Sequence, residues 1–460
     1  MRLVFQLVQF AIIVFPFNGL PYFQDILKEL SPDASVYPFI IALFIWLMMF
    51  LMGIIKLIIP MNVTFKLLLL FIFWSIVSGI SNMAEINENI FKGRTGIEKY
   101  VGQIGVLLFV SLLFLLIYNV CIKTKKPLLE IRKSILISFI IVGMYSVIEI
   151  LYLNGNSSAQ TVLESINPFI RDEGTNSLGQ YGLRLRSVAF EPSHFAMYCS
   201  FAFPWLLSYI ITENRKLWPY LCSIYMLLLM LLTNSRFCYV IGSVQLLLFI
   251  SKLKITYRIN YRSLIGTLIL INTVVMISCF LVSDDSLFSI INTILSLLDS
   301  DNSSNIARYG SQVTAIRMVL DYPIVGVGLG QFGFYMADYV PSWACYNPEI
   351  ISYLANIEGT HWPTVHSLYP RIAAELGFPG LFIWLIMWAN LISGCIRRYY
   401  INLKIGHQTD AMGLTIILSI SGVVFSGWNY DSIRFFGYWL MLGFGMYYIN
   451  SKTEISQKHP

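Results

Sequence analysis

The sequence predicts an all-α polytopic membrane protein, and three observations support this fold class. Of its 460 residues, 57% are hydrophobic and only 12% are charged, which excludes an ordinary soluble domain. The apolar residues fall in runs of the length that helices need to cross a hydrocarbon core. Lys and Arg gather in alternate connectors between these runs. We therefore expect one polytopic membrane domain over residues 1–460.

We expect about twelve membrane-spanning helices, because each crossing requires roughly 20 mostly apolar residues. The predicted spans are 3–18, 37–56, 65–81, 101–121, 135–153, 189–211, 217–232, 236–251, 264–282, 379–396, 411–427 and 433–450. Some of these runs are short, so two of them could be half-spanning or re-entrant. No small-residue cleavage site follows the first run, and we interpret it as a retained span and not as a signal peptide.

Basic residues predict the orientation of the spans. Runs of Lys and Arg lie in the connectors 123–133, 252–262 and 397–404, and the positive-inside rule places such short connectors in the cytoplasm. Both termini are then cytoplasmic as well. The net charge of +6 is thereby explained by membrane orientation, and nucleic acid is not an expected partner.

This orientation assigns a set of connectors to the outer side. They are 19–36, 82–100, 154–188, 233–235, 283–378 and 428–432. The connector 283–378 is a large, partly helical loop between the ninth and tenth spans. Every basic residue of the outer connectors between 154 and 378 is arginine. Arginine binds phosphate with a planar, two-point fork and stays charged in a low dielectric, so these positions predict a site for a phosphorylated ligand.

Three arginines are the preferred phosphate contacts. Arg184 and Arg186 alternate in an extended segment, and we favour Arg186 because it lies nearer the membrane, with Arg184 as a secondary candidate. Arg236 stands at a tight outer turn. Arg308 and Arg317 fall on opposite faces of a predicted helix, so we expect Arg308 to contact the ligand and Arg317 to be structural.

Structural roles remain open for several of these arginines. Arg236 and Arg434 could be interfacial residues that snorkel or pair locally, Arg434 with Asp431 at i,i+3. Arg371 is a further candidate contact, but it stands four residues before Glu375, which is itself a secondary candidate. Arg317 stands likewise four residues before Asp321.

His366 is the predicted catalytic base. It begins an amphipathic stretch at the end of the large loop, and an imidazole of near-neutral pKa is suited to accept the proton of a hydroxyl group. A histidine at a helix start that is bound only by backbone is the alternative. His194 and His361 are weaker candidates, and the carboxylate of Glu191 is another possible base.

The glycines 326, 328 and 330 do not predict a nucleotide site. A dinucleotide fingerprint needs its third glycine at position 331, where Gln331 stands, and no Walker lysine follows. We expect instead a tight turn that returns the chain to the membrane surface after a helix over 304–321. The cysteines are scattered and no metal-ligand motif occurs, so no disulfide framework, metal or other cofactor is expected.

The order of motifs in the loop resembles that of the bacterial O-antigen ligase and polymerase superfamily. The resemblance rests on Arg308, the turn Pro323…Gly326-x-Gly328-x-Gly330-x-Phe332, His366 and the sequence Glu375-x-Gly377-x-x-Gly380. It covers roughly residues 180–400. The superfamily's usual His-Asn pair is His366-Ser367 here, so the asparagine has no counterpart.

The resemblance implies a nucleotide-independent glycosyltransferase in the bacterial inner membrane, with undecaprenyl-pyrophosphate-linked glycans as donor and acceptor. His366 would then assist deprotonation of the acceptor, and Arg186, Arg236 and Arg308 would hold the leaving pyrophosphate. The segment Phe190-Glu191-Pro192-Ser193 looks more like that of polymerases, with O-antigen ligase as the alternative. A chain-length regulator and a flippase are further expected partners. Since Arg186 and Arg236 lie outside the loop, we expect the loop to cover a cleft at the membrane edge.

A transporter or flippase of lipid-linked sugars is the rival class. Such a protein is expected to bury charge near the middle of the membrane in broken helices and to show related halves. Here the candidate charges gather at one face, which favours the enzyme.

Overall fold

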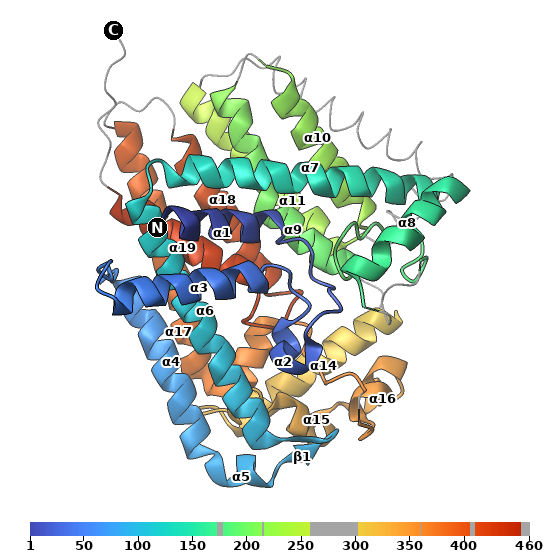
Figure 1. Cartoon of the computed structure of the whole chain (residues 1–460). Coiled ribbons are helices and arrows are strands. Elements are labelled where there is room, and N and C mark those ends of the chain that lie inside the picture. The colour runs from blue at the N-terminus through green and yellow to red at the C-terminus, as the bar shows by residue number, and fades with distance from the viewer. Residues whose placement is uncertain (173–177, 214–215, 258–301, 359, 405–409, 452–460) are drawn as a thin grey trace.

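The protein is almost entirely helical in the computed structural model, which describes residues 1–172, 178–213, 216–257, 302–358, 360–404 and 410–451 (Figure 1). A helix occupies each predicted span within these ranges. These helices are α1 (Arg2–Ile13), α3 (Val36–Leu51), α4 (Val63–Ser81), α6 (Gly96–Lys123), α7 (Pro127–Leu153), α9 (Pro192–Thr212), α10 (Trp218–Leu232), α11 (Arg236–Tyr257), α17 (Leu368–Lys404), α18 (Ala411–Ser426) and α19 (Phe436–Asn450). The predicted ninth span 264–282, the first part of the large loop (283–301) and the C-terminal residues 452–460 lie outside the described residues.

Within the described ranges, α4, α6, α7, α9 and α17 are long and apolar enough to cross a membrane. Shorter apolar helices, among them α1, α3, α10 and α18, accompany them. This composition agrees with a polytopic membrane protein, while the number twelve remains a prediction. The central element is α9, which is buried along most of its length between α7, α10, α11 and α18.

The helix ends follow from local sequence. Thr95 and Glu98 form a capping box at the start of α6, in which each side chain binds the other's backbone N–H. α4 and α18 have simple N-caps: the side chain of Asn62 accepts a hydrogen bond from Phe65 N, and that of Asp410 accepts one from Gly413 N. Proline stands at the first turn of α7, α9 and α10, where a missing N–H has no cost.

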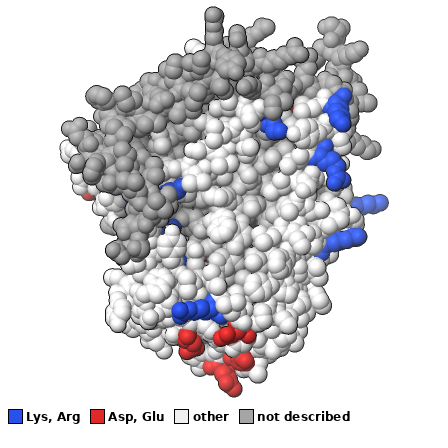
Figure 2. All heavy atoms as spheres, turned by 180° about the vertical axis from the view of Figure 1, so that it is seen from behind, with Lys and Arg blue, Asp and Glu red and all other residues white. Residues whose placement is uncertain are grey.

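The surface seen from behind supports the membrane assignment. Figure 2 shows a broad face with few charged side chains, acidic residues at its lower end and basic residues along one upper edge. Large apolar side chains on α3, α4 and α6, such as Phe44, Phe73 and Leu108, are exposed in the isolated chain. Contiguous exposed apolar surface of this kind suits a lipid environment.

The predicted outer connectors fold into small elements. They are α2 (Gln24–Leu27), the 3-10 helix η1 (Lys28–Leu30), α5 (Met83–Glu88), the antiparallel hairpin of β1 (Ile90–Phe91) and β2 (Arg94–Thr95), α8 (Ser157–Ile170), α14 (Ser303–Asp321), α15 (Phe332–Tyr339), the 3-10 helix η3 (Ser342–Ala344) and α16 (Pro348–Leu354). Elements far apart in sequence meet here. Lys92, for example, donates from Nζ to the carbonyls of Ser352 and His361 at 2.8 and 2.6 Å. Figure 1 places α2, α5, α14, α15 and α16 at the same end of the molecule.

The glycine-rich turn docks onto a kink in α17. Gly377 has φ +69° inside this helix, and Pro379 lacks the N–H that would bind the carbonyl of Glu375. Gly328 N fills that place by donating to the Glu375 carbonyl at 2.9 Å. Gly326 (φ +65°) approaches so closely that a Cβ there would lie 2.4 Å from the carbonyl carbon of Glu375. A tight turn after α14 is what the sequence predicts; its packing against α17 is an additional finding.

Replacing Gly326 with alanine should therefore destabilise the protein. The new methyl group collides with backbone and the left-handed conformation is strained, which together cost about 1–3 kcal/mol. We expect a lower midpoint of thermal unfolding for the purified protein in detergent. Gly102→Ala is the control, because Gly102 lies in α6 with open space around it. Equal melting of Gly326→Ala and wild type would contradict this role of the turn.

Candidate functional site

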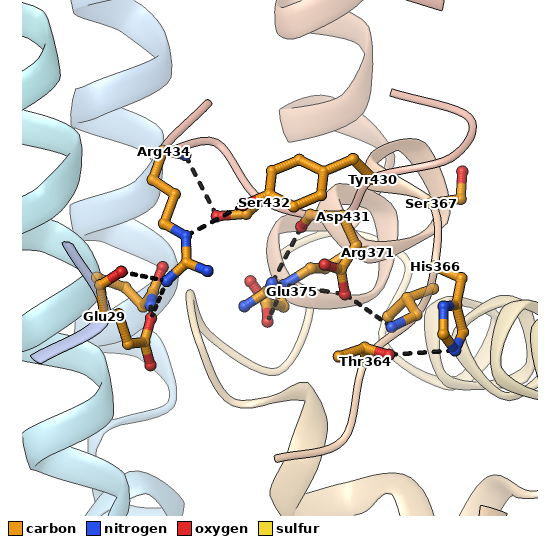
Figure 3. Close-up of polar contacts among 12 residues, drawn as sticks. Glu29, Thr364, His366, Ser367, Arg371, Glu375, Tyr430, Asp431, Ser432 and Arg434 are labelled. Atoms are coloured by element: carbon orange, nitrogen blue, oxygen red, sulfur yellow. Dashed lines mark hydrogen bonds and ion pairs between the residues drawn. The ribbon is translucent and has the colours of Figure 1, made fainter. Parts of the chain in front are cut away.

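His366 lies in a polar cluster at the end of the large loop. Its Nε2 is 3.2 Å from Oε1 of Glu349, 3.2 Å from Oγ1 of Thr364 and 3.4 Å from the hydroxyl of Tyr353. Tyr353 also donates to Glu349 at 2.7 Å. The imidazole remains 19% exposed, so one edge faces outward from the cluster. Figure 3 shows Thr364 and His366 beside the connector that carries Tyr430 and Asp431.

Glu349 determines which imidazole nitrogen is available. Its pKa is lowered to about 2 by the hydrogen bond from His366, then by Tyr353 and by the positive charge of Arg308, which together outweigh the effect of burial. An ionised carboxylate accepts hydrogen bonds only, so Nε2 carries the proton that points at it. Within the described part of the chain, no hydrogen bond joins Nδ1 to another protein group. The lone pair of Nδ1 can then accept a proton.

The backbone around His366 is held in place from the α18–α19 connector. Val365 N donates to Oδ2 of Asp431 at 2.8 Å, and Leu368 N donates to the carbonyl of Gly427 at 2.7 Å. His366 itself adopts φ +59°, a left-handed conformation that is uncommon outside glycine. Such strain persists only where neighbouring contacts impose it, and it is frequent at functional sites.

Arg308 approaches this cluster from α14. Its Nη1 donates to Oδ1 of Asn429 at 2.7 Å, and its charge contributes to the low pKa of Glu349. Arg308 is half-buried, whereas Arg317 is exposed on the other side of the helix and binds only the Tyr339 carbonyl among the contacts described. The two arginines therefore divide between helix faces as predicted.

Arg236 lies beside Arg308. Its Nη1 donates to Oδ1 of Asn305, which stands one helical turn before Arg308 on the same face of α14. The structure thus brings together Arg236, from the turn between α10 and α11, and Arg308, from the large loop.

Arg184 and Arg186 line a pocket between α7, α8 and the segment before α9, with about 300 Å³ of empty space that includes open solvent. Arg184 Nε donates to the Thr233 carbonyl at 3.2 Å, and the Arg186 guanidinium lies 5.2 Å from the centre of the Tyr181 ring. A third arginine, Arg171, also lines this pocket and was not expected from the sequence. Its Nε finds no hydrogen-bond partner in the described chain, and neither does Oε2 of Glu149, which lines the same pocket.

Glu191 and His194 pair at the start of α9. His194 Nδ1 is 3.2 Å from Oε1 of Glu191. Burial opposes ionisation of Glu191, but hydrogen bonds from His194 and Ser193 and the charge of Arg308 lower its pKa to about 2. A carboxylate held ionised in this way is a weak base, so Glu191 is a poorer candidate for the base than His366. His361 is exposed, and its carbonyl binds Lys92, away from the cluster.

Arg371 and Arg434 each form an ion pair with an acidic side chain (Figure 3). Arg371 Nε donates to Oε1 of the buried Glu375 at 3.1 Å, and its Nη1 donates to the Asp431 carbonyl at 3.0 Å. The pairing of Arg434 with Asp431 is wrong, since Arg434 binds Tyr430 and, through Nη1, the carbonyl of Glu29 at 2.6 Å. These contacts favour structural roles for Arg371, Arg434 and Glu375.

Glu29 is the centre of a second network that sequence reasoning missed. Its carboxylate binds Lys99 at 2.5 Å and Gln103 at 2.9 Å, and it lies 3.5 Å from Arg94. Burial disfavours the charge, but Lys99 and Arg434 lower the pKa of Glu29 to about 2. This network fastens the first outer connector to α6 and to the α18–α19 connector. Its three positive groups, Arg94, Lys99 and Arg434, share this one carboxylate.

Among the described residues, no group of three or more His, Cys, Asp or Glu side chains is placed to hold a metal ion. A metal-independent reaction remains a prediction.

Comparison with known proteins identifies one related family. Residues 221–385 match the sequence model of the family described as O-antigen ligase. This region runs from α10 into α17 and includes Arg236, Arg308, Glu349 and His366. No curated protein matches the chain. This segment is therefore similar to the O-antigen ligase family, which confirms the predicted resemblance to the O-antigen ligase and polymerase superfamily.

Proposed function

We propose that this protein is a surface-polysaccharide polymerase, a glycosyltransferase that joins undecaprenyl-pyrophosphate-linked oligosaccharide repeat units on the outer face of the inner membrane. The observation that carries the proposal is the arrangement of His366. Its Nε2 is bound to Glu349 and its Nδ1 is left as a proton acceptor, while the charge of Arg308 acts on Glu349 and Arg236 binds Asn305, one helical turn before Arg308. Transfer of a glycan from a sugar pyrophosphate requires a base for the acceptor hydroxyl group and fixed positive charges for the leaving pyrophosphate.

The reaction balances without a nucleotide or a metal. A hydroxyl group of the acceptor repeat attacks the anomeric carbon of the donor sugar, and its proton passes to Nδ1 of His366. The bond between that carbon and the pyrophosphate oxygen breaks as the new glycosidic bond forms. Undecaprenyl pyrophosphate leaves with the bonding electrons, and Arg308, Arg236 and Arg186 stabilise its charge. Glu349 stabilises the imidazolium that forms on His366.

An O-antigen ligase, which transfers a finished glycan to lipid A-core, is the second candidate, because the matching family is described by that activity. Both enzymes would use the same donor and leaving group. Deleting the gene separates them. Loss of a polymerase leaves single repeats on lipid A-core, or one-repeat glycans, at the cell surface. Loss of a ligase leaves polymer on its lipid carrier and none on the core, which would contradict the polymerase assignment.

A flippase that delivers the lipid-linked repeats and a regulator of chain length are the protein partners that this function requires. Both remain proposals. The polymerase can act only on repeats already exposed at the outer face, which is where the arginines and His366 are expected from the positive-inside rule.

Replacing Glu349 with glutamine should lower the transfer rate about 10- to 100-fold, because the neutral amide no longer stabilises the charged imidazolium. With a pKa of about 2, Glu349 stays ionised across the neutral range. The stabilisation of the imidazolium by this negative charge is fully present above the ordinary pKa of glutamate and is lost only as the pH falls toward 2. We therefore expect the acidic limb of the pH–rate profile to move to lower pH in the variant, whereas no such shift arises from a purely structural role.

Glu358→Gln provides the matched control, since Glu358 is exposed in the same loop. An unchanged pH–rate profile for Glu349→Gln would show that Glu349 does not act through His366.

A further inference from the structure

A second pocket, with about 360 Å³ of empty space that includes open solvent, is not part of the catalytic arrangement described above. Its walls come from the ends of α1, α9 and α19 and from the connectors before α3 and α19. Aromatic rings dominate the lining, and two titratable side chains face the same space. The main lining residues are Phe15, Asp33, His194, Tyr198, Tyr430 and Phe435. The pocket lies outside the segment matched by the O-antigen ligase family.

Asp33 is an unsatisfied acceptor in this pocket. Its backbone forms turn hydrogen bonds, but its carboxylate accepts no hydrogen bond from any residue in the described ranges. Burial raises the pKa of Asp33 to about 6, against the opposing positive charges of Arg434 and His194. A half-buried carboxylate with no donor from the protein can bind a ligand that donates hydrogen bonds to it.

The chemistry of the pocket selects among ligand classes. A pyrophosphate would meet the negative charge of Asp33 in a low dielectric, which is unfavourable. An isoprenoid chain would offer the Asp33 carboxylate no hydrogen-bond donor. A sugar ring suits both the carboxylate and the aromatic walls, since its hydroxyl groups donate to Asp33 and its C–H faces pack on the rings.

The pocket adjoins the reacting groups through two residues. Tyr430 lines it, and its sequence neighbours Asn429 and Asp431 bind Arg308 and Val365 N respectively. His194 lines it too and binds Glu191, whose pKa is lowered in part by the charge of Arg308. A ligand in this pocket would therefore contact the same connector that binds Arg308 and the backbone beside His366.

We propose that this pocket is a saccharide subsite, which binds one sugar residue of a lipid-linked repeat unit through Asp33 and the surrounding aromatic rings. The inference rests on the proposed function, because it assumes that the protein's substrates are glycans. It adds a specificity-determining site at the membrane edge. Asp33 contacts the sugar hydroxyl groups, and the shape of the aromatic walls selects the ring that enters.

Direct binding measurements test the subsite. Purified full-length protein in lipid nanodiscs is titrated calorimetrically with the single-repeat oligosaccharide, prepared by hydrolysis of the source cell's own surface glycan and free of lipid and phosphate. Undecaprenyl pyrophosphate without sugar is the second probe. Asp33→Ala should weaken oligosaccharide binding about 10- to 100-fold, the effect of losing hydrogen bonds to a charged group. Its affinity for undecaprenyl pyrophosphate should be unchanged.

Two further variants keep the test decisive. Phe15→Leu removes an aromatic wall at similar volume and should also weaken oligosaccharide binding. Asp338→Ala, the same change at an exposed position of α15, should bind both probes like wild type. The subsite is refuted if Asp33→Ala and Phe15→Leu bind the oligosaccharide normally, or if they lose undecaprenyl pyrophosphate instead.

This experiment also separates the subsite from the proposed reaction. His366→Ala should bind the oligosaccharide like wild type, because His366 is outside the pocket. Pocket-dependent sugar binding by a protein that forms no polymer would overturn the polymerase assignment and leave the subsite intact. If the wild type forms polymer but Asp33→Ala binds the oligosaccharide normally, the subsite is refuted and the polymerase assignment stands.

Discussion

Replacing His366 with alanine is expected to abolish polymer formation. Removal of a positioned general base costs typically about 10²–10⁴-fold in rate. Nε2 of His366 is held by the ionised carboxylate of Glu349, while Nδ1 remains available. Loss of the imidazole should lower the turnover number and leave the affinity for the lipid-linked donor nearly unchanged, since the arginines that bind the pyrophosphate remain. The length distribution of surface glycan and the rate with purified substrate both report this effect.

His361→Ala is the matched control for this prediction. His361 lies in the same loop, is exposed and contributes only its backbone carbonyl to a described contact. It should retain wild-type activity. Both variants should be expressed at the wild-type level and melt at similar temperatures. Polymer of normal length and amount in cells that carry His366→Ala would eliminate His366 as the base.

Arg308→Ala should cause the second large loss, about 10²–10³-fold in the transfer rate, the range found when a fixed donor to developing negative charge is removed. Here both the affinity for the donor and the turnover number should fall, because the guanidinium contacts the pyrophosphate before and during bond cleavage. Arg308→Lys should restore only part of the activity, since an ammonium group cannot form the two-point contact with phosphate oxygens.

Arg317→Ala tests whether the effect depends on position or on charge. Arg317 lies on the same helix and carries the same charge, but it is exposed on the opposite face. We expect near wild-type activity from this variant. Equal losses for Arg308→Ala and Arg317→Ala would indicate a general electrostatic effect or a damaged α14 in place of a specific contact.

The sequence predicts the helices well because their physical signal is local. Apolar runs, first-turn prolines and capping residues such as Thr95 and Asp410 define where helices begin, and a helix was found for each predicted span within the described ranges. The kink at Gly377 is less evident, since it depends on a glycine turn from a distant segment that supplies the missing hydrogen bonds.

The partners of the candidate site are harder to predict because they come from separate connectors. Helical periodicity suffices to separate Arg308 from Arg317, and the i,i+4 spacing of Arg371 and Glu375 correctly indicates an ion pair. No such rule links Glu349 to His366 or Glu29 to Arg434, which are brought together only by the fold. Arg171 is next to an acidic residue in the sequence, so the sequence alone does not indicate that it lines the same pocket as Arg184 and Arg186.

The role of Asp33 could not be predicted either. In the sequence it is one acidic residue in a short polar connector, with no motif around it. Its significance arises from the rings that surround it, which come from the two ends of the chain and from α9. Sites of this kind depend on tertiary packing, and local patterns carry no signal for them.

Reconstitution of the purified protein in liposomes with its lipid-linked repeat unit tests the central claim most directly. The wild type should convert single repeats into a ladder of longer undecaprenyl-pyrophosphate-linked glycans without nucleotide or lipid A-core, and His366→Ala should produce none. A wild-type protein that leaves the repeats unchanged until lipid A-core is added would contradict the polymerase assignment. A full ladder with His366→Ala would contradict the site.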